Sequence, residues 1–453
     1  MPVLYISTNG TGEAIPFRKA LMQGMAPDKG LYMPTEYPLF NRNMIREFHK
    51  MTYPEIACSV IHPFLSEELS EQECLDLANK AYTFDLPLEP VDGNRYLLRL
   101  DRGPTCSFKD FGARMMALLV QYFMKDNPYP VTILTATSGD TGSAIASAFY
   151  EMENIRVVIL FPEKEISTRQ RKQMTTLGKN IEAIAVDGKF DDCQQMVKKA
   201  FADPDLHPLN LTSANSINVG RLIPQSVYYF YACTRIDPAA EERVLISVPS
   251  GNFGNASGCL LAKKMGLPVQ KMIFATNSND TFPKFLYTGI YRKIEPSIPC
   301  ISSAMNVGHP SNLARIVNLY GGKMDETGLI TVIPDMKSMC RDIFSMAVSE
   351  EQTRNTISHA FREYGIMLEP HGAIGWAGLD RFLEEERPSM GADSISISLE
   401  TAHPAKFPEE ITDILQIDPD PPTSIKALDD KQEKIERIDK RYQPLKEHLL
   451  GCC

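Results

Sequence analysis

The chain has 453 residues, of which 43% are hydrophobic and 23% are charged, and its formal net charge is -10. This length exceeds what one hydrophobic core supports, so two or three packed units are expected and a single small domain is excluded. The composition is that of a folded chain and excludes a disordered one. Because the net charge is negative, the sequence predicts no nucleic-acid or membrane partner that is recognised through a basic surface.

Neither a membrane span nor a secretion signal is predicted. No stretch approaches the roughly 20 apolar residues of a membrane helix, and Met1 to Gly10 lack the regions of a signal peptide, so we expect a cytoplasmic location. The ten cysteines form no Cys-x-x-Cys pair and no cluster with histidine, which favours reduced thiols and no metal site. The adjacent Cys452 and Cys453 suggest lipidation, but no other feature supports an anchor.

The beginning of the chain, residues 1–92, differs in pattern from the rest. Its short apolar segments are interrupted by prolines, which favour short helices and turns over long regular elements. We therefore expect a small N-terminal domain. The prolines are Pro16, Pro27, Pro34, Pro38, Pro54 and Pro63.

In the segment 93–425, short β-branched runs alternate with amphipathic segments of helical length. This alternation predicts an α/β fold of parallel sheets covered by helices. We expect a smaller unit at 130–235 and a larger one formed by 93–129 plus 236–417. The predicted strands are Val131–Thr135, Arg156–Phe161, Ile181–Val186, Leu209–Thr212, Val244–Val248, Met272–Thr276 and Ser394–Leu399. The predicted helices are Ser143–Met152, Ser167–Leu177, Phe190–Phe201 and Asn218–Thr234.

The last part of the chain is polar. The stretch Asp418–Thr423 (DPDPPT) cannot form a helix and predicts an extended linker. The segment 426–453 is dense in lysine, aspartate and glutamate and poor in large apolar residues. This pattern is typical of a solvated, charged terminal helix or tail.

Two glycine-rich turns directly follow predicted strands. Thr135–Gly142 (TATSGDTG) precedes one predicted helix, and Pro249–Asn255 (PSGNFGN) precedes another. Glycine allows a tight turn in which N–H groups converge at a helix N-terminus and bind an anion. A carboxylate suits the first turn and a phosphate the second, and a purely structural turn is the alternative for each. Neither has the pattern of a P-loop or a dinucleotide site, which disfavours ATP and NAD.

Lys109 lies in Gly103–Arg114 (GPTCSFKDFGAR), between an apolar run and a predicted helix. Its neighbours Phe108 and Phe111 are aromatic, and partial desolvation lowers the pKa of a lysine. The neutral amine that results can attack a carbonyl carbon. An ordinary surface lysine is the alternative, but the presence of Lys109 together with two possible anion-binding turns favours a catalytic role.

These three segments together resemble the signature blocks of threonine synthases, which are fold-type II enzymes that use pyridoxal phosphate (PLP). The resemblance implies a fold like that of the tryptophan synthase β subunit, with two doubly wound parallel-sheet units and a small N-terminal domain. Matching blocks run in family order from residue 4 to about 411. The further blocks are Leu4–Thr8, Lys29–Pro34, Ser213–Asn218 with Arg221, Glu369–Gly372 and Glu400–Phe407.

The resemblance also implies a cofactor site. Lys109 matches the lysine that carries PLP and moves protons on the substrate. Thr401 matches the hydroxyl that meets the pyridine nitrogen, and a neutral hydroxyl leaves that nitrogen largely unprotonated. The residues that match the cup for the cofactor phosphate are Ser250, Gly251, Asn252, Phe253, Gly254 and Asn255.

The resemblance implies a reaction that converts O-phosphohomoserine and water into threonine and phosphate. It also implies two groups of residues that bind this substrate. One group would hold the substrate carboxylate, and the other would hold its phosphate, for which an arginine offers a bidentate fork. The carboxylate group comprises Thr137, Ser138, Gly139, Asp140 and Thr141. The phosphate group comprises Ser216, Asn218 and Arg221.

Four positions depart from the family pattern, namely Asp101, Arg102, Asn306 and His309. They bear on the choice of substrate and not on the cofactor. One alternative is therefore another fold-type II PLP lyase, acting on a β- or γ-substituted amino acid such as phosphoserine. A cofactor-binding homologue without catalysis is a further alternative.

Two histidines, His371 and His403, lie in matched blocks. A general base is one interpretation, and a hydrogen-bonded structural histidine near the cleft is the other, which we favour. The expected partner is a small-molecule substrate, and the sequence leaves both a monomer and a homodimer open.

Overall fold

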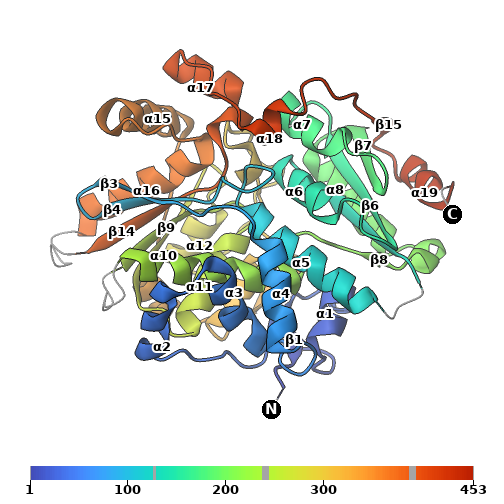
Figure 1. The fold of residues 1–453 in the computed structure, drawn as a ribbon, viewed down its shortest axis with the longest axis horizontal. Helices are drawn as coiled ribbons and strands as arrows, with labels where there is room; N and C mark the ends of the chain where they lie inside the picture. Colours follow the sequence, from blue (N-terminus) through green and yellow to red (C-terminus); the bar gives the residue numbers. More distant parts are fainter. Residues whose placement is uncertain (1, 126–128, 237–243, 387–393, 452–453) are drawn as a thin grey trace.

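The computed structural model describes residues 2–125, 129–236, 244–386 and 394–451 (Figure 1). Within these ranges the chain forms one smaller and one larger β-sheet with helices around both, and no helix is long and apolar enough to cross a bilayer. Cys452 and Cys453, the pair that suggested lipidation, lie outside the described residues.

The beginning of the chain forms short helices next to a two-stranded antiparallel ribbon, as the spacing of its prolines predicted. β1 (Tyr5–Ser7) pairs with β2 (Tyr32–Pro34). At the start of α3, the hydroxyl of Thr52 and the carboxylate of Glu55 form a capping box, which satisfies N–H groups that have no partner inside the helix. The helices here are α1 (Phe17–Gln23), α2 (Arg42–Glu47), α3 (Tyr53–Ile61) and α4 (Glu71–Ala81).

The smaller sheet is entirely parallel and has the strand order β15-β7-β6-β5-β8. Each of its first three strands in the chain is followed by a helix, which returns the chain to the start of the next strand. The strands are β5 (Val131–Ala136), β6 (Ile155–Pro162), β7 (Ile181–Asp187), β8 (Leu211–Thr212) and β15 (Glu436–Asp439). The helices are α6 (Asp140–Phe149), α7 (Thr168–Thr175), α8 (Phe190–Phe201) and α19 (Tyr442–Gly451).

The larger sheet has the order β13-β10-β9-β14-β4-β3 and is parallel except for β3, which is antiparallel to β4. Its strands are β3 (Leu88–Asp92), β4 (Arg95–Arg99), β9 (Val244–Pro249), β10 (Val269–Thr276), β13 (Ile343–Ala347) and β14 (Ile395–Glu400). Its helices include α5 (Lys109–Met124), α10 (Val227–Ile236), α11 (Gly254–Lys264), α12 (Thr281–Thr288), α13 (Leu313–Leu319), α14 (Met336–Asp342), α15 (Glu350–Tyr364), α16 (Pro370–Glu386), α17 (Pro408–Leu415) and α18 (Thr423–Lys426). A ribbon of β11 (Lys323–Met324) and β12 (Ile330–Val332) lies apart from both sheets.

Both faces of the larger sheet are buried, which explains why its strands are apolar throughout. On β9, Leu245 packs with Leu379 and Phe382 of α16, while Val244 and Ile246 on the opposite face belong to the main core. Successive side chains of a strand point to opposite faces, so a strand buried on both sides needs a continuous apolar run. The doubly wound α/β architecture predicted from the sequence is confirmed.

Most predicted elements agree with the observed ones to within a few residues, with two local differences. Only Leu211–Thr212 of the run Leu209–Thr212 is a strand, because Leu209 ends a 3-10 turn. The predicted helix Asn218–Thr234 is divided into α9 (Val219–Leu222), a 3-10 turn and α10. Pro224 lies in that turn, and a proline has no N–H with which to continue a helix.

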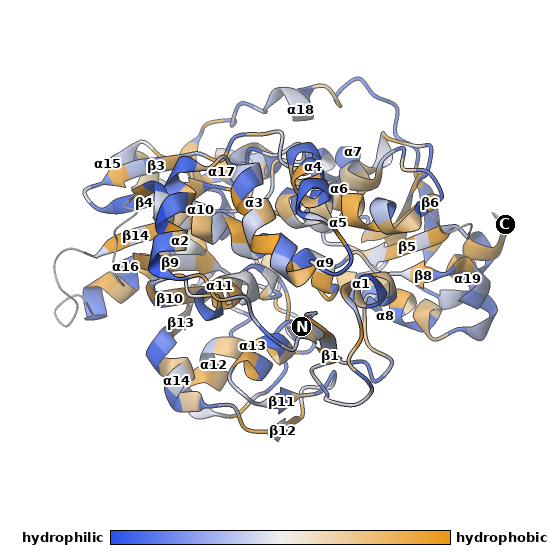
Figure 2. Ribbon diagram, turned by 60° about the horizontal axis from the view of Figure 1, so that its bottom comes forward, coloured by the Kyte–Doolittle hydropathy of each residue, from blue (hydrophilic) through white to orange (hydrophobic). Residues whose placement is uncertain are grey.

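The terminal helix predicted for 426–453 is present as α19, but the segment also contains a strand that was not predicted, and one side of the helix is buried. β15 pairs in parallel with β7 and extends the smaller sheet. Figure 1 shows β15 and α19 on the same side of the molecule as β7, and Figure 2 shows α19 next to α8. Leu445 and Leu449 of α19 are fully buried against α8. The sequence did not predict β15 because this strand is short and charged, and because its hydrogen bonds are made with the distant strand β7. We propose that each sheet is the core of one of the two expected units, with β15 and α19 added to the smaller unit.

This arrangement makes a prediction about stability. Leu445→Ala would leave a cavity between α19 and α8 and should lower the free energy of unfolding by about 2–5 kcal/mol. Urea denaturation followed by circular dichroism measures this change. Leu450→Ala is the matched control because Leu450 is 40% exposed. Equal effects of the two substitutions would show that α19 is not packed as described.

Candidate active site

Lys109 is the first residue of α5, and the loop before it is fixed to the segment that follows β14. The backbone N–H of Phe108 donates to the carbonyl of Thr401 at 2.8 Å, and the N–H of His403 donates to the carbonyl of Cys106 at 3.0 Å. These backbone bonds set the separation of the two residues that the sequence singled out for the cofactor, Lys109 and Thr401.

The side chain of Lys109 is 13% exposed, and its Nζ lies 3.5 Å from Oδ2 of Asp140. The same ammonium lies 4.6 Å from the centre of the Phe108 ring. Burial lowers the pKa of Lys109, Asp140 opposes this shift, and the charges of Lys406 and Arg221 add to it. The amine is therefore held closer to its neutral, nucleophilic form than a surface lysine would be.

Lys406 is a second, fully buried lysine at this site, and the sequence analysis gave it no role. Its Nζ contacts Oδ1 of Asp140 at 2.7 Å and donates to the carbonyl of Thr105 at 2.8 Å. Gln170 of α7 donates to the same carboxylate oxygen at 2.9 Å. Although burial alone would raise the pKa of Asp140, Lys406 and Lys109 hold it well below its usual range, so Asp140 is ionised.

The turn between β5 and α6 presents backbone N–H groups next to these charges. The hydroxyl of Thr137 accepts from the N–H groups of Gly139 at 3.0 Å and Gly142 at 2.8 Å, which closes the turn. Gly139 has a φ of 119°, a conformation that favours glycine. The N–H groups of Asp140 and Thr141 begin α6 and have no acceptor within the described residues. A substrate carboxylate would therefore meet the backbone here, because the side chain of Asp140 faces the lysines.

The turn between β9 and α11 forms a cradle of N–H groups. The N–H of Ser250 donates to Ala275, whereas those of Gly251, Asn252 and Gly254 have no acceptor within the described residues. A Cβ added at Gly251 would lie 2.6 Å from the Cα of Met305, so glycine is required there. Unpaired N–H groups at a helix N-terminus suit a phosphate, and the turn therefore fits the phosphate of PLP.

Ser216 adjoins this cradle. Its hydroxyl accepts from Asn252 at 2.9 Å and from Asn312 at 3.0 Å. Arg315, which is fully buried and pairs with no carboxylate among the described residues, donates to the carbonyls of Ser216 and Ile217 at 2.6 Å each. Burial lowers the pKa of Arg315 to about 9. No role was predicted from the sequence for Asn312 and Arg315, which lie a few residues after Asn306 and His309 in the chain.

Asn218 and Arg221 differ in whether their side chains keep a polar atom that could bind a substrate. The amide of Asn218 donates to the carbonyls of Leu21 and Ser213 at 2.8 and 2.9 Å, and its oxygen caps α9, so all its polar atoms serve the fold. Arg221 donates to Ala214, but its Nε is buried and has no partner within the described residues. Burial lowers the pKa of Arg221 to about 10. Of these two, only Arg221 keeps a polar group free.

Thr401 is tied to a buried carboxylate. Its hydroxyl donates to Oε1 of Glu369 at 3.2 Å, and Oε2 of Glu369 lies 2.5 Å from Nδ1 of His371. Nε2 of His371 accepts from the N–H of Ala304 at 3.1 Å, so the ring proton is on Nδ1. His403 caps the following 3-10 turn, and burial lowers its pKa to about 4. Both histidines have structural partners, in keeping with the interpretation we favoured.

Family models match nearly all of the chain. Residues 86–398 match the model for the pyridoxal-phosphate dependent enzymes. Residues 4–82 match the threonine synthase N terminus, and residues 372–449 match the threonine synthase C-terminal region. The chain belongs to the threonine synthase family. Its cofactor class is thereby PLP, as expected from the sequence.

Relatives and solved structures agree with this membership. The threonine synthase of Escherichia coli K12 is 38% identical over 439 residues, covering 97% of this chain and 94% of the relative. That of Serratia marcescens is 39% identical and covers 89% of each chain. The crystal structure of the E. coli enzyme covers 99% of this chain and 100% of its own, with a TM-score of 0.89. A PLP-bound threonine synthase from Brucella melitensis covers 99% of each chain, with a TM-score of 0.90 and 32% identity.

The four residues that depart from the pattern of the threonine synthase family all have protein partners. The carboxylate of Asp101 is almost fully buried and accepts two hydrogen bonds from the guanidinium of Arg99. These contacts make the four residues parts of local polar networks. The partners are Arg99 for Asp101, Glu89 for Arg102, Asn277 for Asn306 and Tyr291 for His309.

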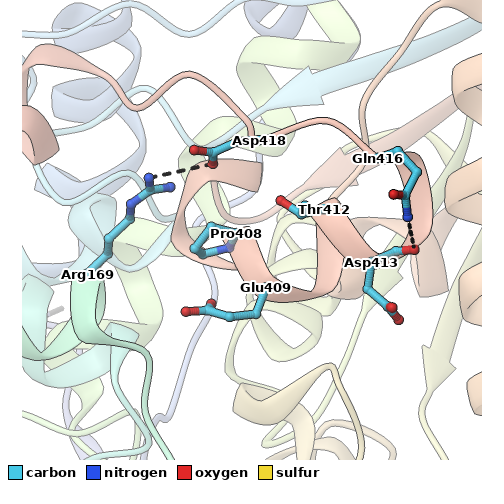
Figure 3. Close-up of a pocket in the computed structure, with 7 residues that line it drawn as sticks. All are labelled: Arg169, Pro408, Glu409, Thr412, Asp413, Gln416 and Asp418. Atoms are coloured by element: carbon cyan, nitrogen blue, oxygen red, sulfur yellow. Dashed lines mark hydrogen bonds and ion pairs between the residues drawn. The ribbon is translucent and has the colours of Figure 1, made fainter.

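A separate surface hollow of about 500 Å³ lies between α7 and α17 (Figure 3). Arg169 and Asp418 face each other across its edge at 3.7 Å. None of the sequence-predicted site residues lines it, so we assign it no part in the chemistry. The lining residues are Arg169, Pro408, Glu409, Thr412, Asp413, Gln416 and Asp418.

The cradle at Gly251 makes a prediction about cofactor binding. Gly251→Ala would force the turn away from Met305 and should weaken PLP binding by on the order of tenfold, a loss of about 1.4 kcal/mol. Titration of the full-length chain with PLP, followed by visible absorbance, measures the dissociation constant. Gly451→Ala is the control, since a Cβ there would meet no atom within 4 Å. An unchanged affinity in Gly251→Ala would place the cofactor phosphate elsewhere.

Proposed function

We propose that this chain is a threonine synthase that converts O-phosphohomoserine and water into threonine and phosphate, with Lys109 carrying PLP. The observation that carries this proposal is the position of the Lys109 amine, 3.5 Å from Asp140 in the turn that begins α6. A nucleophilic amine thus adjoins N–H groups that suit a carboxylate. Membership of the threonine synthase family supports the choice of reaction.

Bound PLP supplies an electron sink for charge that develops on the substrate carbons. The Nζ of Lys109 removes and returns protons at those carbons. The N–H groups of Asp140 and Thr141 bind the substrate carboxylate, and the guanidinium of Arg221 with the hydroxyl of Ser216 receives the phosphate. A positive charge at the departing oxygens favours loss of phosphate, because negative charge develops there.

The test is a paired assay on the full-length protein. Incubation with O-phosphohomoserine should give threonine and phosphate in equal amounts, and Lys109→Ala should give neither and should lack the visible absorbance of carried cofactor. Phosphoserine tests the alternative lyase. If phosphoserine is consumed and O-phosphohomoserine is not, the proposed substrate is wrong while the cofactor assignment stands.

The role of Arg221 makes a separate prediction. Arg221→Lys keeps the charge but loses the planar fork, and should raise KM for O-phosphohomoserine by on the order of tenfold with little change in PLP affinity. Steady-state kinetics and PLP titration measure the two effects. Arg114→Lys is the control, because Arg114 donates to the carbonyls of Lys80 and Ala81 on another side of α5. An unchanged KM in Arg221→Lys would remove Arg221 from the phosphate site.

A further inference from the structure

Lys406 is a buried cation that has no assigned role in the proposed reaction. It ends the 3-10 turn Pro404–Lys406, and its side chain has no exposed area. Its backbone is also held, since the hydroxyl of Ser167 donates to its carbonyl at 2.9 Å and Arg169 donates to the carbonyl of Ala405 at 2.7 Å. A lysine is rarely buried so completely unless it is paired, so the position of its charge demands an explanation.

Asp140 is the only carboxylate paired with Lys406 among the described residues, and it is shared with Lys109. The contact with Lys406 is 2.7 Å, whereas the contact with Lys109 is 3.5 Å. Two cations therefore face one anion, and the shorter contact belongs to the lysine that does no chemistry. Without Lys406, Asp140 and Lys109 would form an ordinary buried ion pair, which keeps a lysine protonated and unreactive.

Other charged and titratable groups lie near Lys109, Asp140 and Lys406. Arg221 adds positive charge near Lys109, and Asp110 adds negative charge near Lys406. The oxygens of Asp110 accept from the N–H and hydroxyl of Thr105 at 2.8 and 2.7 Å, and burial raises the pKa of Asp110. Cys106 and His403 also lie near Lys406, and burial favours the neutral form of each. His371 also acts on the pKa of Asp140, in the same direction as the two lysines.

We propose that Lys406 is a positioning residue that keeps the amine of Lys109 neutral by neutralising the carboxylate of Asp140. Lys109 can then accept a proton at Nζ from a substrate carbon, because the neighbouring anion is already balanced and does not hold a proton on Nζ beforehand. This inference rests on the proposed function only in assigning the reacting amine to Lys109.

The test measures the charge of Lys109 directly, without substrate. The full-length chain, before addition of PLP, is acylated with acetic anhydride over a range of pH, and the extent of modification at Lys109 is read by peptide mass spectrometry. Only the neutral amine reacts, so the midpoint of the pH profile reports the protonation of Lys109. The variants are Lys406→Met, Lys406→Gln, Lys406→Arg and Asp140→Asn.

Removal of the Lys406 charge should raise the midpoint by on the order of one pH unit, since Asp140 then pairs with Lys109 alone. Asp140→Asn should lower the midpoint, because the positive charge of Lys406 then acts on Lys109 with no anion to balance it. Lys406→Arg should stay near the wild type. The control is Lys446→Met. Lys446 lies in α19 and pairs with Asp203 at 2.9 Å, so its removal should leave the midpoint of Lys109 unchanged.

The proposal is overturned if both charge-removing variants keep the wild-type midpoint, or if Lys406→Arg shifts it as much as Lys406→Met. Lys406→Gln keeps a hydrogen-bonding group for Thr105 and decides the question if the methionine variant does not fold. If neither folds, Asp140→Asn decides it, since a midpoint that does not fall contradicts the proposal. Failure of the proposed function is recognised separately, because it would abolish threonine formation in the wild type while leaving these midpoints as expected.

Discussion

The carboxylate of Asp140 lies between two buried ammonium groups, and the rest of the site depends on how these three charges are held together. A buried charge is costly unless it is paired and hydrogen-bonded, so Asp140, Lys109 and Lys406 stabilise one another only in this arrangement. Each comes from a different part of the chain: the start of α6, the start of α5 and the turn after β14. The fold must therefore bring three distant segments to one point.

The parallel sheets achieve this through the carboxyl ends of their strands. β5 ends at the turn proposed for the substrate carboxylate, β9 ends at the cradle proposed for the cofactor phosphate, and β14 ends next to Thr401. In open α/β sheets ligands bind beyond these strand ends, where helix N-termini also point. Backbone hydrogen bonds between the loop before Lys109 and the segment after β14 then fix the position of Lys109 relative to Thr401.

Local patterns in the sequence were enough to predict the strands, the helices that follow them and both glycine-rich turns. They could not predict contacts between distant residues. The roles of Lys406 and Arg315 depend on partners far away in the chain, and the partner of β15 is β7, about 250 residues earlier. Asn218 is a different case: its position in a matched block suggested a ligand, whereas in the structure its amide donates to the carbonyls of Leu21 and Ser213.

Lys109 is proposed to carry the cofactor although a second buried lysine, Lys406, lies beside the same carboxylate. The measurement that tests this assignment most directly is borohydride reduction of the PLP-loaded wild type, which fixes the cofactor to its lysine, followed by peptide mapping with mass spectrometry. We expect the pyridoxyl group on the peptide that contains Lys109 and none on the peptide that contains Lys406. A pyridoxyl group on Lys406, or on any lysine other than Lys109, would contradict it.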